Sequence, residues 1–180
     1  MRPTRADLQD AHGRTIPDVL AADLRVLFAG INPGLWSAAT GHHFARPGNR
    51  FWPALHASGF TPRLLAPEEQ DLLLGLGLGI TNVAARATAR ADELTVDELI
   101  VGGRALADKV RRHRPAWLAV VGVTAYRTAF DVRRARVGPQ PERIGTTRVW
   151  VLPNPSGLNA HWSAAALAGE FARLRDAVGT

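Results

Sequence analysis

The chain has 180 residues, about the size of a single domain, and 46% of them are hydrophobic. Its formal net charge of +6 comes almost entirely from arginine, because Lys109 is the only lysine; such a charge fits a polyanionic partner, but also a genome rich in G and C. The absence of cysteine excludes disulfides, a cysteine nucleophile, thiolate zinc sites and cysteine-bound iron–sulfur clusters.

Neither a membrane nor a metal is indicated. The sequence has no apolar run of about 18 residues, and its polar start, residues 1–7, lacks the apolar core of a signal peptide. The six histidines do not form a His-Glu-x-x-His pattern. We therefore expect an intracellular protein without a metal site.

Residues 1–23 are predicted to be a polar lead-in, and 24–180 a single domain. Short apolar runs that end in Pro or Gly turns predict buried strands, and segments that open with capping residues predict helices. After the lead-in, the predicted elements are a strand at 25–31, a Gly/Pro/Arg-rich loop to about 50, helices at 49–59 and from 67, a strand at 79–83, a helix at 95–114, a strand at 117–122, a helix at 123–130, a charged loop at 131–146, a strand at 148–152 and a helix at 163–177.

The alternation of strands and helices predicts an α/β fold. We expect a three-layer α/β/α sandwich whose central sheet is mainly parallel and has four to five strands. In such sheets the ligand binds outside the carboxyl ends of the strands. The loops after Ile31, Val83, Gly122 and Leu152 should therefore surround one cleft.

The loop after the first strand carries an amide, Asn32, within GINPG at 30–34. The sequence has no glycine-rich nucleotide motif, phosphate loop or serine elbow to suggest other chemistry. An amide can orient a water molecule but is a poor general base. It suits the cleavage of an N-glycosidic bond, whose transition state already separates charge. The alternative is that Asn-Pro-Gly is simply a turn.

The loop after the fourth predicted strand places an apolar residue, Leu158, in a turn stiffened by proline and glycine, 154–159. An exposed apolar tip can be pushed into a base stack, and free backbone N–H groups beside it can bind phosphates or a base edge. The alternative is a plain connection in which Leu158 folds back onto the core.

Four segments carry a resemblance to a known family. They are GINPG at 30–34, GHHF at 41–44, GNRFW at 48–52 and LPNPSGL at 152–158. In order and spacing they resemble the mismatch-specific uracil/thymine-DNA glycosylases of the uracil-DNA glycosylase superfamily, over about residues 24–175. Neither loop motif alone would be informative, but the combination is specific.

The resemblance implies a monofunctional DNA glycosylase. Such an enzyme flips uracil, and thymine or other modified pyrimidines, out of G mismatches, hydrolyses the N-glycosidic bond and initiates base excision repair. Asn32 would position the hydrolytic water. The backbone around Ile31, with Gly34, and the ring of Phe44 would hold and stack the flipped base, the alternative for Phe44 being the core.

The resemblance also assigns the second loop. Ser156, Gly157, Leu158 and Asn159 would form a DNA-binding wedge, with Leu158 filling the vacated stack and Gly157 and Asn159 contacting the orphaned guanine. Bacterial relatives have an arginine where this chain has Ala160. The guanine contact is therefore weakened, or is made by Asn159 or His161.

At two further positions the sequence departs from the bacterial pattern and resembles the thymine-DNA glycosylase branch. One is the pair at 42–43, of which His43 is counted among the substrate-binding residues. The other is Asn82, which stands where bacterial uracil enzymes carry lysine. Asn82 could read the Watson–Crick edge of a pyrimidine, since an amide is donor and acceptor at once.

Asp92 follows the second predicted strand, where bacterial relatives have an amide. A carboxylate near Asn32 could act as a general base or stabilise the positive sugar, so Asp92 is a candidate catalytic residue. The alternative is a solvated loop acid before the helix that starts at Thr95.

Two other functions stay open from the residues. One is a DNA-lesion-binding protein of the same fold with little turnover. The other is an unrelated α/β hydrolase or nucleotide-binding enzyme, for which no nucleophile or phosphate loop is found. For the glycosylase we expect no cofactor, a monomer, double-stranded DNA with a mismatched or damaged pyrimidine as partner, no membrane, and a cytoplasmic, nucleoid-associated location.

Overall fold

The structure is a computed structural model, and it describes residues 1–179. Five strands form one sheet in the spatial order β2-β1-β3-β5-β4. The strands are β1 (Val26–Gly30), β2 (Leu78–Asn82), β3 (Trp117–Val121), β4 (Gly138–Ile144) and β5 (Thr147–Leu152). All neighbours pair in parallel except β4, which is antiparallel to β5 at the edge of the sheet.

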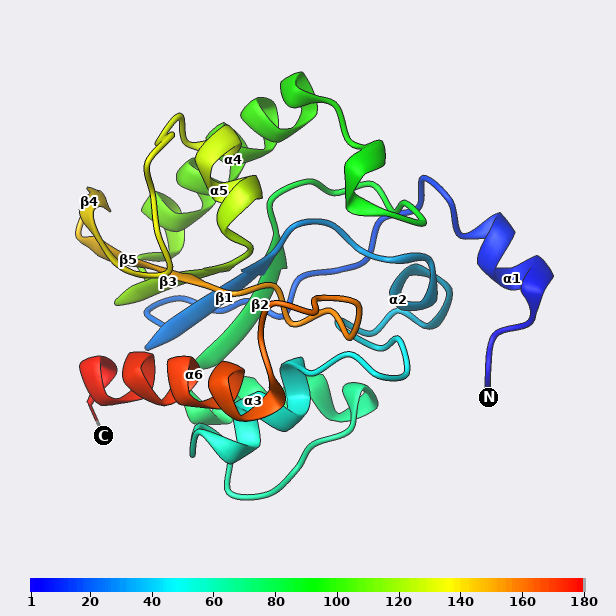
Figure 1. Ribbon diagram of the computed structural model, residues 1–180, viewed down its shortest axis with the longest axis horizontal. Helices are drawn as coiled ribbons and strands as arrows, with labels where there is room; N and C mark the ends of the chain where they lie inside the picture. The colour runs from blue at the N-terminus through cyan, green and yellow to red at the C-terminus, as the bar shows by residue number, and fades with distance from the viewer. Residues whose placement is uncertain (180) are drawn as a thin grey trace.

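Helices cover both faces of the sheet (Figure 1). One face packs against α3 (Phe51–Ala57), the 3-10 helix η1 (Pro67–Leu76) and α6 (Ala164–Val178), and the other against α4 (Val96–His113) and α5 (Val123–Ala129). The predicted three-layer α/β/α architecture with a mainly parallel sheet is confirmed.

β1 illustrates why the apolar runs become strands. All five of its residues are buried. Phe28 belongs to the core on the α3 and α6 side, whereas Leu27 and Ala29 belong to the core under α4 and α5. A parallel strand covered on both faces has no side for solvent, so its sequence is continuously apolar.

Part of one predicted loop is a strand. The charged segment 131–146 was expected to be irregular, but 138–144 form β4. Most of its side chains are exposed, and Pro139 and Pro141 cannot donate to a ladder. Such a segment is tolerated as a strand only at an edge, which is where it lies.

Two helical details also differ from expectation. The predicted loop to residue 50 contains a short helix, α2 (Leu35–Thr40), which begins directly after the first loop. The helix predicted from Pro67 is present as the 3-10 helix η1, and Gly77 ends it in a left-handed conformation.

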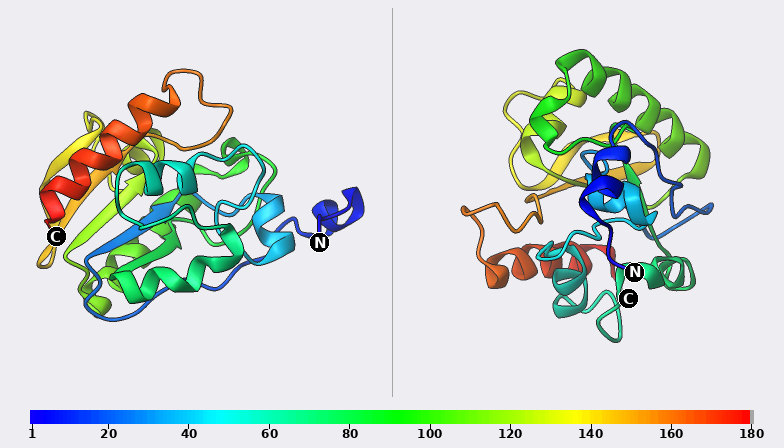
Figure 2. Two further views of the ribbon diagram at one scale, coloured as in Figure 1. Left: turned by 90° about the horizontal axis from the view of Figure 1, so that it is seen from below. Right: turned by 90° about the vertical axis from the view of Figure 1, so that its right-hand side faces the viewer.

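The segment before β1 contacts the sheet. Val19 pairs with Ile80 of β2, and the side chain of Asp18 accepts bonds from Thr81 Oγ1 at 2.8 Å and from Lys109 Nζ at 2.5 Å. The single lysine of the chain is thus used to hold this segment against β2. Further upstream, α1 (Arg5–Asp10) lies beside α2, away from the sheet (Figures 1 and 2).

Within residues 1–179, no helix is both long and apolar enough to span a membrane.

Candidate active site

A cleft of about 400 Å³ lies at the carboxyl ends of the strands. It is bounded by the loops that follow β1, β2 and β5 and by the segment between α2 and α3. Nine of the eleven predicted site residues line it, namely Ile31, Asn32, Gly34, His43, Phe44, Asn82, Asp92, Ser156 and Leu158. The loops after β1, β2 and β5 therefore surround one cleft as expected, whereas the loop after Gly122 contributes no residue to it and β3 reaches it only through Val121. Gly157 lines only an adjoining hollow, and Asn159 lines neither.

The side chain of Asn32 is fixed through its nitrogen. Asn32 Nδ2 donates to the carbonyl of Arg86 at 2.9 Å and to Thr88 Oγ1 at 2.8 Å. A carbonyl only accepts, so the nitrogen must face Arg86. The hydroxyl of Thr88 donates to the carbonyl of Arg90 at 2.6 Å, so it must accept from Asn32. Both amide hydrogens are thereby used, and Oδ1 remains as the group that can bind a water in the cleft.

The partners of Asn32 come from the segment after β2, which runs alongside the loop after β1. Thr88 N donates to Pro33 O at 3.2 Å, and Ala84 N donates to Ile31 O at 2.9 Å. Thr88 is 1% exposed. Sequence reasoning missed Thr88, because nothing in the local pattern announces that these two loops pair.

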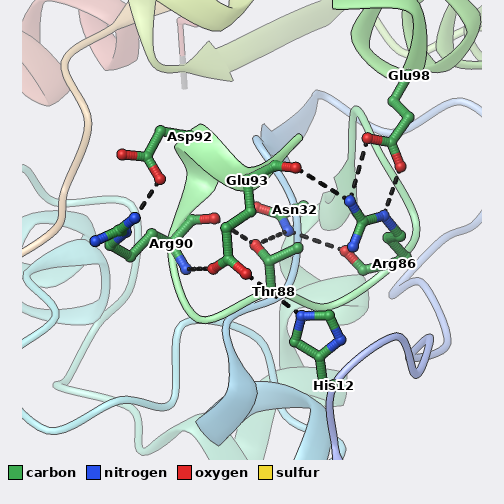
Figure 3. A network of polar contacts seen from close by, with 8 residues as sticks. All are labelled: His12, Asn32, Arg86, Thr88, Arg90, Asp92, Glu93 and Glu98. Carbon is green, nitrogen blue, oxygen red and sulfur yellow. Dashed lines mark hydrogen bonds and ion pairs between the residues drawn. The ribbon is translucent and has the colours of Figure 1, made fainter. Parts of the chain in front are cut away.

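An ion pair also holds the segment after β2 in place (Figure 3). The guanidinium of Arg86 binds both carboxylate oxygens of Glu98 and the carbonyl of Glu93. Glu98 also accepts the backbone N–H of Thr95, which caps α4 as its sequence predicted. These bonds lower the pKa of Glu98 to about 2, with Arg86 the main cause. The carbonyl that orients Asn32 therefore belongs to a residue that is itself held in place.

Asp92 lies at the edge of the cleft and points away from Asn32 (Figure 3). It lies in the short 3-10 helix η2 (Ala91–Glu93), its carboxylate pairs with Arg90 Nε at 3.1 Å, and its side chain is 73% exposed. No hydrogen bond joins the carboxylate of Asp92 to Asn32 or Thr88. The structure thus brings Asp92 to the cleft but not into the network of Asn32.

Asn82 ends β2 on the floor of the cleft, next to Gly30 of β1. A Cβ atom at Gly30 would lie 2.6 Å from Asn82 Oδ1 and 3.3 Å from the ring of Phe44. Only glycine at position 30 therefore allows the amide and the ring to approach the end of β1 as they do.

His43 is buried and acts within the protein. Its Nε2 lies 2.9 Å from the carbonyl of Pro17, which requires the proton on that nitrogen, so Nδ1 can accept from Asn82 Nδ2 at 3.5 Å. Burial is the main cause that lowers the pKa of His43 below 6.5. A neutral His43 of this tautomer orients Asn82 and has no N–H left for a ligand.

Phe44 combines the two alternatives considered for it. One face of its ring stacks on Phe51 at a centroid distance of 4.1 Å, and the ring also lines the cleft. Its backbone has φ +53°, a conformation that is costly for a bulky residue and persists only where neighbours impose it. The bonds from His43 N to Gln70 and from Ala45 N to Ser37 supply that constraint.

Leu158 is the exposed apolar tip that the sequence predicted. Its side chain lies at the mouth of the cleft, the residue is 78% exposed, and the loop between β5 and α6 stands out from the body of the molecule (Figure 2). The alternative in which Leu158 folds onto the core is excluded by this exposure.

The polar side chains of the loop are used inside it. Ser156 Oγ accepts from Leu158 N at 3.2 Å, and Asn159 binds the carbonyl of Asn154 with Nδ2 and the N–H of His161 with Oδ1. By contrast, the N–H of Gly157 donates to no group of the described residues. Of the predicted wedge residues, Leu158 and the backbone of Gly157 are the groups presented to a partner.

Within residues 1–179, no three His, Asp or Glu side chains gather in a way that could hold a metal ion.

Comparison with known proteins decides the family. A family model described as the uracil DNA glycosylase superfamily matches residues 17–176. The chain belongs to the uracil DNA glycosylase superfamily. The match covers all the residues that line the cleft except Ile16.

A solved structure supports the superfamily fold. The chain is similar to a protein from Methanosarcina acetivorans, solved by NMR and provisionally named a uracil DNA glycosylase, with a TM-score of 0.59 and 20% sequence identity. The similarity covers 90% of this chain and 98% of the other. Membership of the superfamily supports a DNA glycosylase, with DNA as the polymer on which it acts.

Proposed function

We propose that this protein is a monofunctional, mismatch-specific DNA glycosylase that hydrolyses the bond between deoxyribose and uracil, or thymine, opposite guanine. The observation that carries the proposal is the fixed amide of Asn32, whose nitrogen is fully bonded and whose oxygen is left for a water. Orientation of a water is the contribution that an amide can make to such a reaction.

The proposed step needs no base strong enough to deprotonate water beforehand. The C1′–N1 bond breaks first, its electron pair leaves with the pyrimidine as an anion, and the sugar becomes an oxocarbenium ion. The water bound to Asn32 Oδ1 then forms the new C1′–O bond and loses a proton, which neutralises the departing base. Asn32 positions the oxygen atom, and the positive sugar supplies the reactivity.

The floor of the cleft fits a flipped pyrimidine. Asn82 offers an acceptor and a donor, as the N3–H and O4 edge of uracil or thymine requires. The free part of the Phe44 ring offers an aromatic surface for the base. His43 contributes by fixing the orientation of the Asn82 amide.

Three features support, in turn, hydrolysis, the mismatch preference and the binding of DNA. The only lysine, Lys109, is bonded to Asp18 and Thr81 and does not line the cleft, so no lysine amine is available there for a Schiff base. The unused N–H of Gly157, beside Leu158, can bind the base that loses its partner. Arg46 and Arg90 line the cleft and can face phosphates.

An excision panel tests the proposal. Uracil, thymine and ethenocytosine are placed opposite each base in duplexes and in single strands, and alkali-labile abasic sites are counted beyond one enzyme equivalent. We expect turnover on G·U and the strongest preference for guanine as the opposite base, with Asn32→Ala as the inactive control. Tight binding with no abasic sites beyond one equivalent would instead identify a lesion-binding protein of the same fold.

A further inference from the structure

The guanidinium of Arg50 binds the loop that carries Leu158. Its guanidinium donates to the carbonyls of Ser156 at 2.9 Å, of Asn159 at 3.1 Å and of Trp162. All three acceptors belong to the segment 154–162, between β5 and α6. No carboxylate of the described residues pairs with Arg50.

The backbone reinforces this attachment. Arg50 N donates to Pro155 O at 2.9 Å, and a Cβ atom at Gly157 would lie only 2.7 Å from Gly48 O. The segment 46–50 and the segment 154–162 are therefore closely packed at several points. Arg50 itself is the N-cap of α3, which packs in the core through Phe51, so the attachment is rigid on the side of Arg50.

We propose that Arg50 is a positioning residue that holds the 154–162 loop in the shape that presents Leu158 to duplex DNA. The inference rests on the proposed function, since it assumes that Leu158 unstacks a base pair. Arg50 would act through Leu158, contacting neither the flipped base nor a phosphate. It would therefore set the preference for duplex over single-stranded substrate.

Arginine is suited to this task in a way that lysine is not. A planar guanidinium presents several N–H groups in a fixed fork, so one side chain can reach three carbonyls at once. A lysine would keep the charge but would lose this geometry. Charge and geometry can thus be separated by substitution.

The experiment compares Arg50→Met and Arg50→Lys with the unaltered enzyme on uracil in duplex and in single-stranded DNA. We expect both variants to lose about tenfold in single-turnover rate on duplex DNA, because a misplaced wedge no longer opposes restacking. The rate on single strands should stay unchanged. Full rescue by Arg50→Lys would mean that Arg50 acts as a phosphate contact, and an equal loss on both substrates would mean a role in the chemistry or the fold; either result overturns the proposal.

Arg127→Met is the matched control. Arg127 is also half-buried and binds a carbonyl, that of Ala135 at 2.8 Å, but it lines no part of the cleft. Its loss removes a comparable guanidinium–carbonyl bond and one positive charge. A similar loss of duplex activity in Arg127→Met would show that the effect is general destabilisation.

Two further measurements keep the test decisive. In a double-mutant cycle, Arg50→Met should have almost no effect on duplex activity once Leu158 is already alanine, whereas additive losses contradict action through Leu158. Chymotrypsin should cleave within 154–162 faster in Arg50→Met than in Arg127→Met, and equal cleavage would contradict the clamp. The proteolysis needs no substrate, so it tests Arg50 even if the enzyme excises no uracil, in which case the proposed function fails by itself.

Discussion

The two loops that define the cleft are held in opposite ways. In the loop after β1, the side chain of Asn32 is bonded through its nitrogen, and a single oxygen atom is left over. In the loop after β5, the carbonyls of Ser156 and Asn159 accept hydrogen bonds from Arg50, and the whole side chain of Leu158 stays exposed. The first arrangement orients one atom, and the second exposes an apolar surface. Changes in the first loop should therefore affect every substrate, whereas changes in the second should depend on how well the target base is stacked.

Asn32→Ala should have the largest effect. Removing the oxygen that holds the water should lower the single-turnover rate by about 10²–10³-fold, as is usual for the loss of one precisely placed polar group. Duplex and single-stranded substrates should suffer equally, and DNA affinity should persist, because the change affects the chemical step. A near-normal rate would make Asn32 only a turn residue.

Thr88→Val should have the next largest effect, and again on all substrates. The variant keeps the shape of the side chain but removes the acceptor that orients Asn32, so we expect a loss of about tenfold in rate. Thr88→Ser restores the hydroxyl and should recover most of the rate.

Thr147→Val supplies the control for Thr88. Thr147 is equally buried, and its hydroxyl donates to Pro115 O at 2.6 Å at the opposite end of β5 from the cleft. Its loss should lower the free energy of unfolding without changing the rate. Equal rate losses at both positions would contradict a positioning role for Thr88.

Leu158→Ala should distinguish the roles of the two loops most directly. Unstacking a base from a duplex costs a few kcal/mol and costs least for a base that is mispaired or single-stranded. We therefore expect a loss of about tenfold on duplex uracil and little change on single strands. A uniform loss would remove the distinction between the loops.

The sequence was sufficient for the architecture because the buried strands have no polar face. Continuous apolar runs ended by Pro or Gly, such as the one containing Phe28, predict strands covered on both sides. β4 escaped prediction because its side chains are mostly exposed and its prolines are typical of a loop. Its pairing is imposed by the exposed edge of β5, which no local pattern encodes.

The site was predictable to the extent that residue type and position after a strand determine it. Asn32, Asn82 and Leu158 follow from such reasoning, and the structure places all three in one cleft. Thr88, Arg86 and Arg50 do not, because each acts through a backbone carbonyl or an amide of a distant segment. Bonds from side chains to remote carbonyls leave no signal in the composition or spacing of a single sequence.

The free energy of unfolding should depend moderately on pH through His43, which lies at the floor of the cleft. Burial lowers the pKa of His43 in the folded protein below 6.5, so below pH 6.5 the unfolded chain binds more protons than the folded one. The free energy of unfolding should therefore fall as the pH decreases below 6.5, with a slope of at most about 1.4 kcal/mol per pH unit from this group.

Urea unfolding of the protein and of His43→Gln between pH 7.5 and 5 measures this contribution. The pKa values of Glu69 and Glu98, about 2, are depressed from 4.5, so their effects lie at lower pH. The variant should show a flatter dependence on pH within this window. Identical slopes would mean that His43 does not carry the effect.

Asp92→Asn should have the smallest effect, and it tests whether the loop after β1 receives help from a carboxylate. A general base at this position would predict a loss of about 10²-fold or more in single-turnover rate and the disappearance of an acidic limb from the pH profile. The carboxylate is instead 73% exposed and is bonded to Arg90 rather than to the network of Asn32. We therefore expect a change of less than about threefold, as for an exposed substitution, with an unchanged pH profile. DNA affinity should rise slightly, since the substitution removes a negative charge from the mouth of the cleft, where phosphates would approach. If the rate falls by about 10²-fold while binding is unchanged, the loop that carries Asp92 must rearrange when DNA binds, and the amide of Asn32 would then work beside a base.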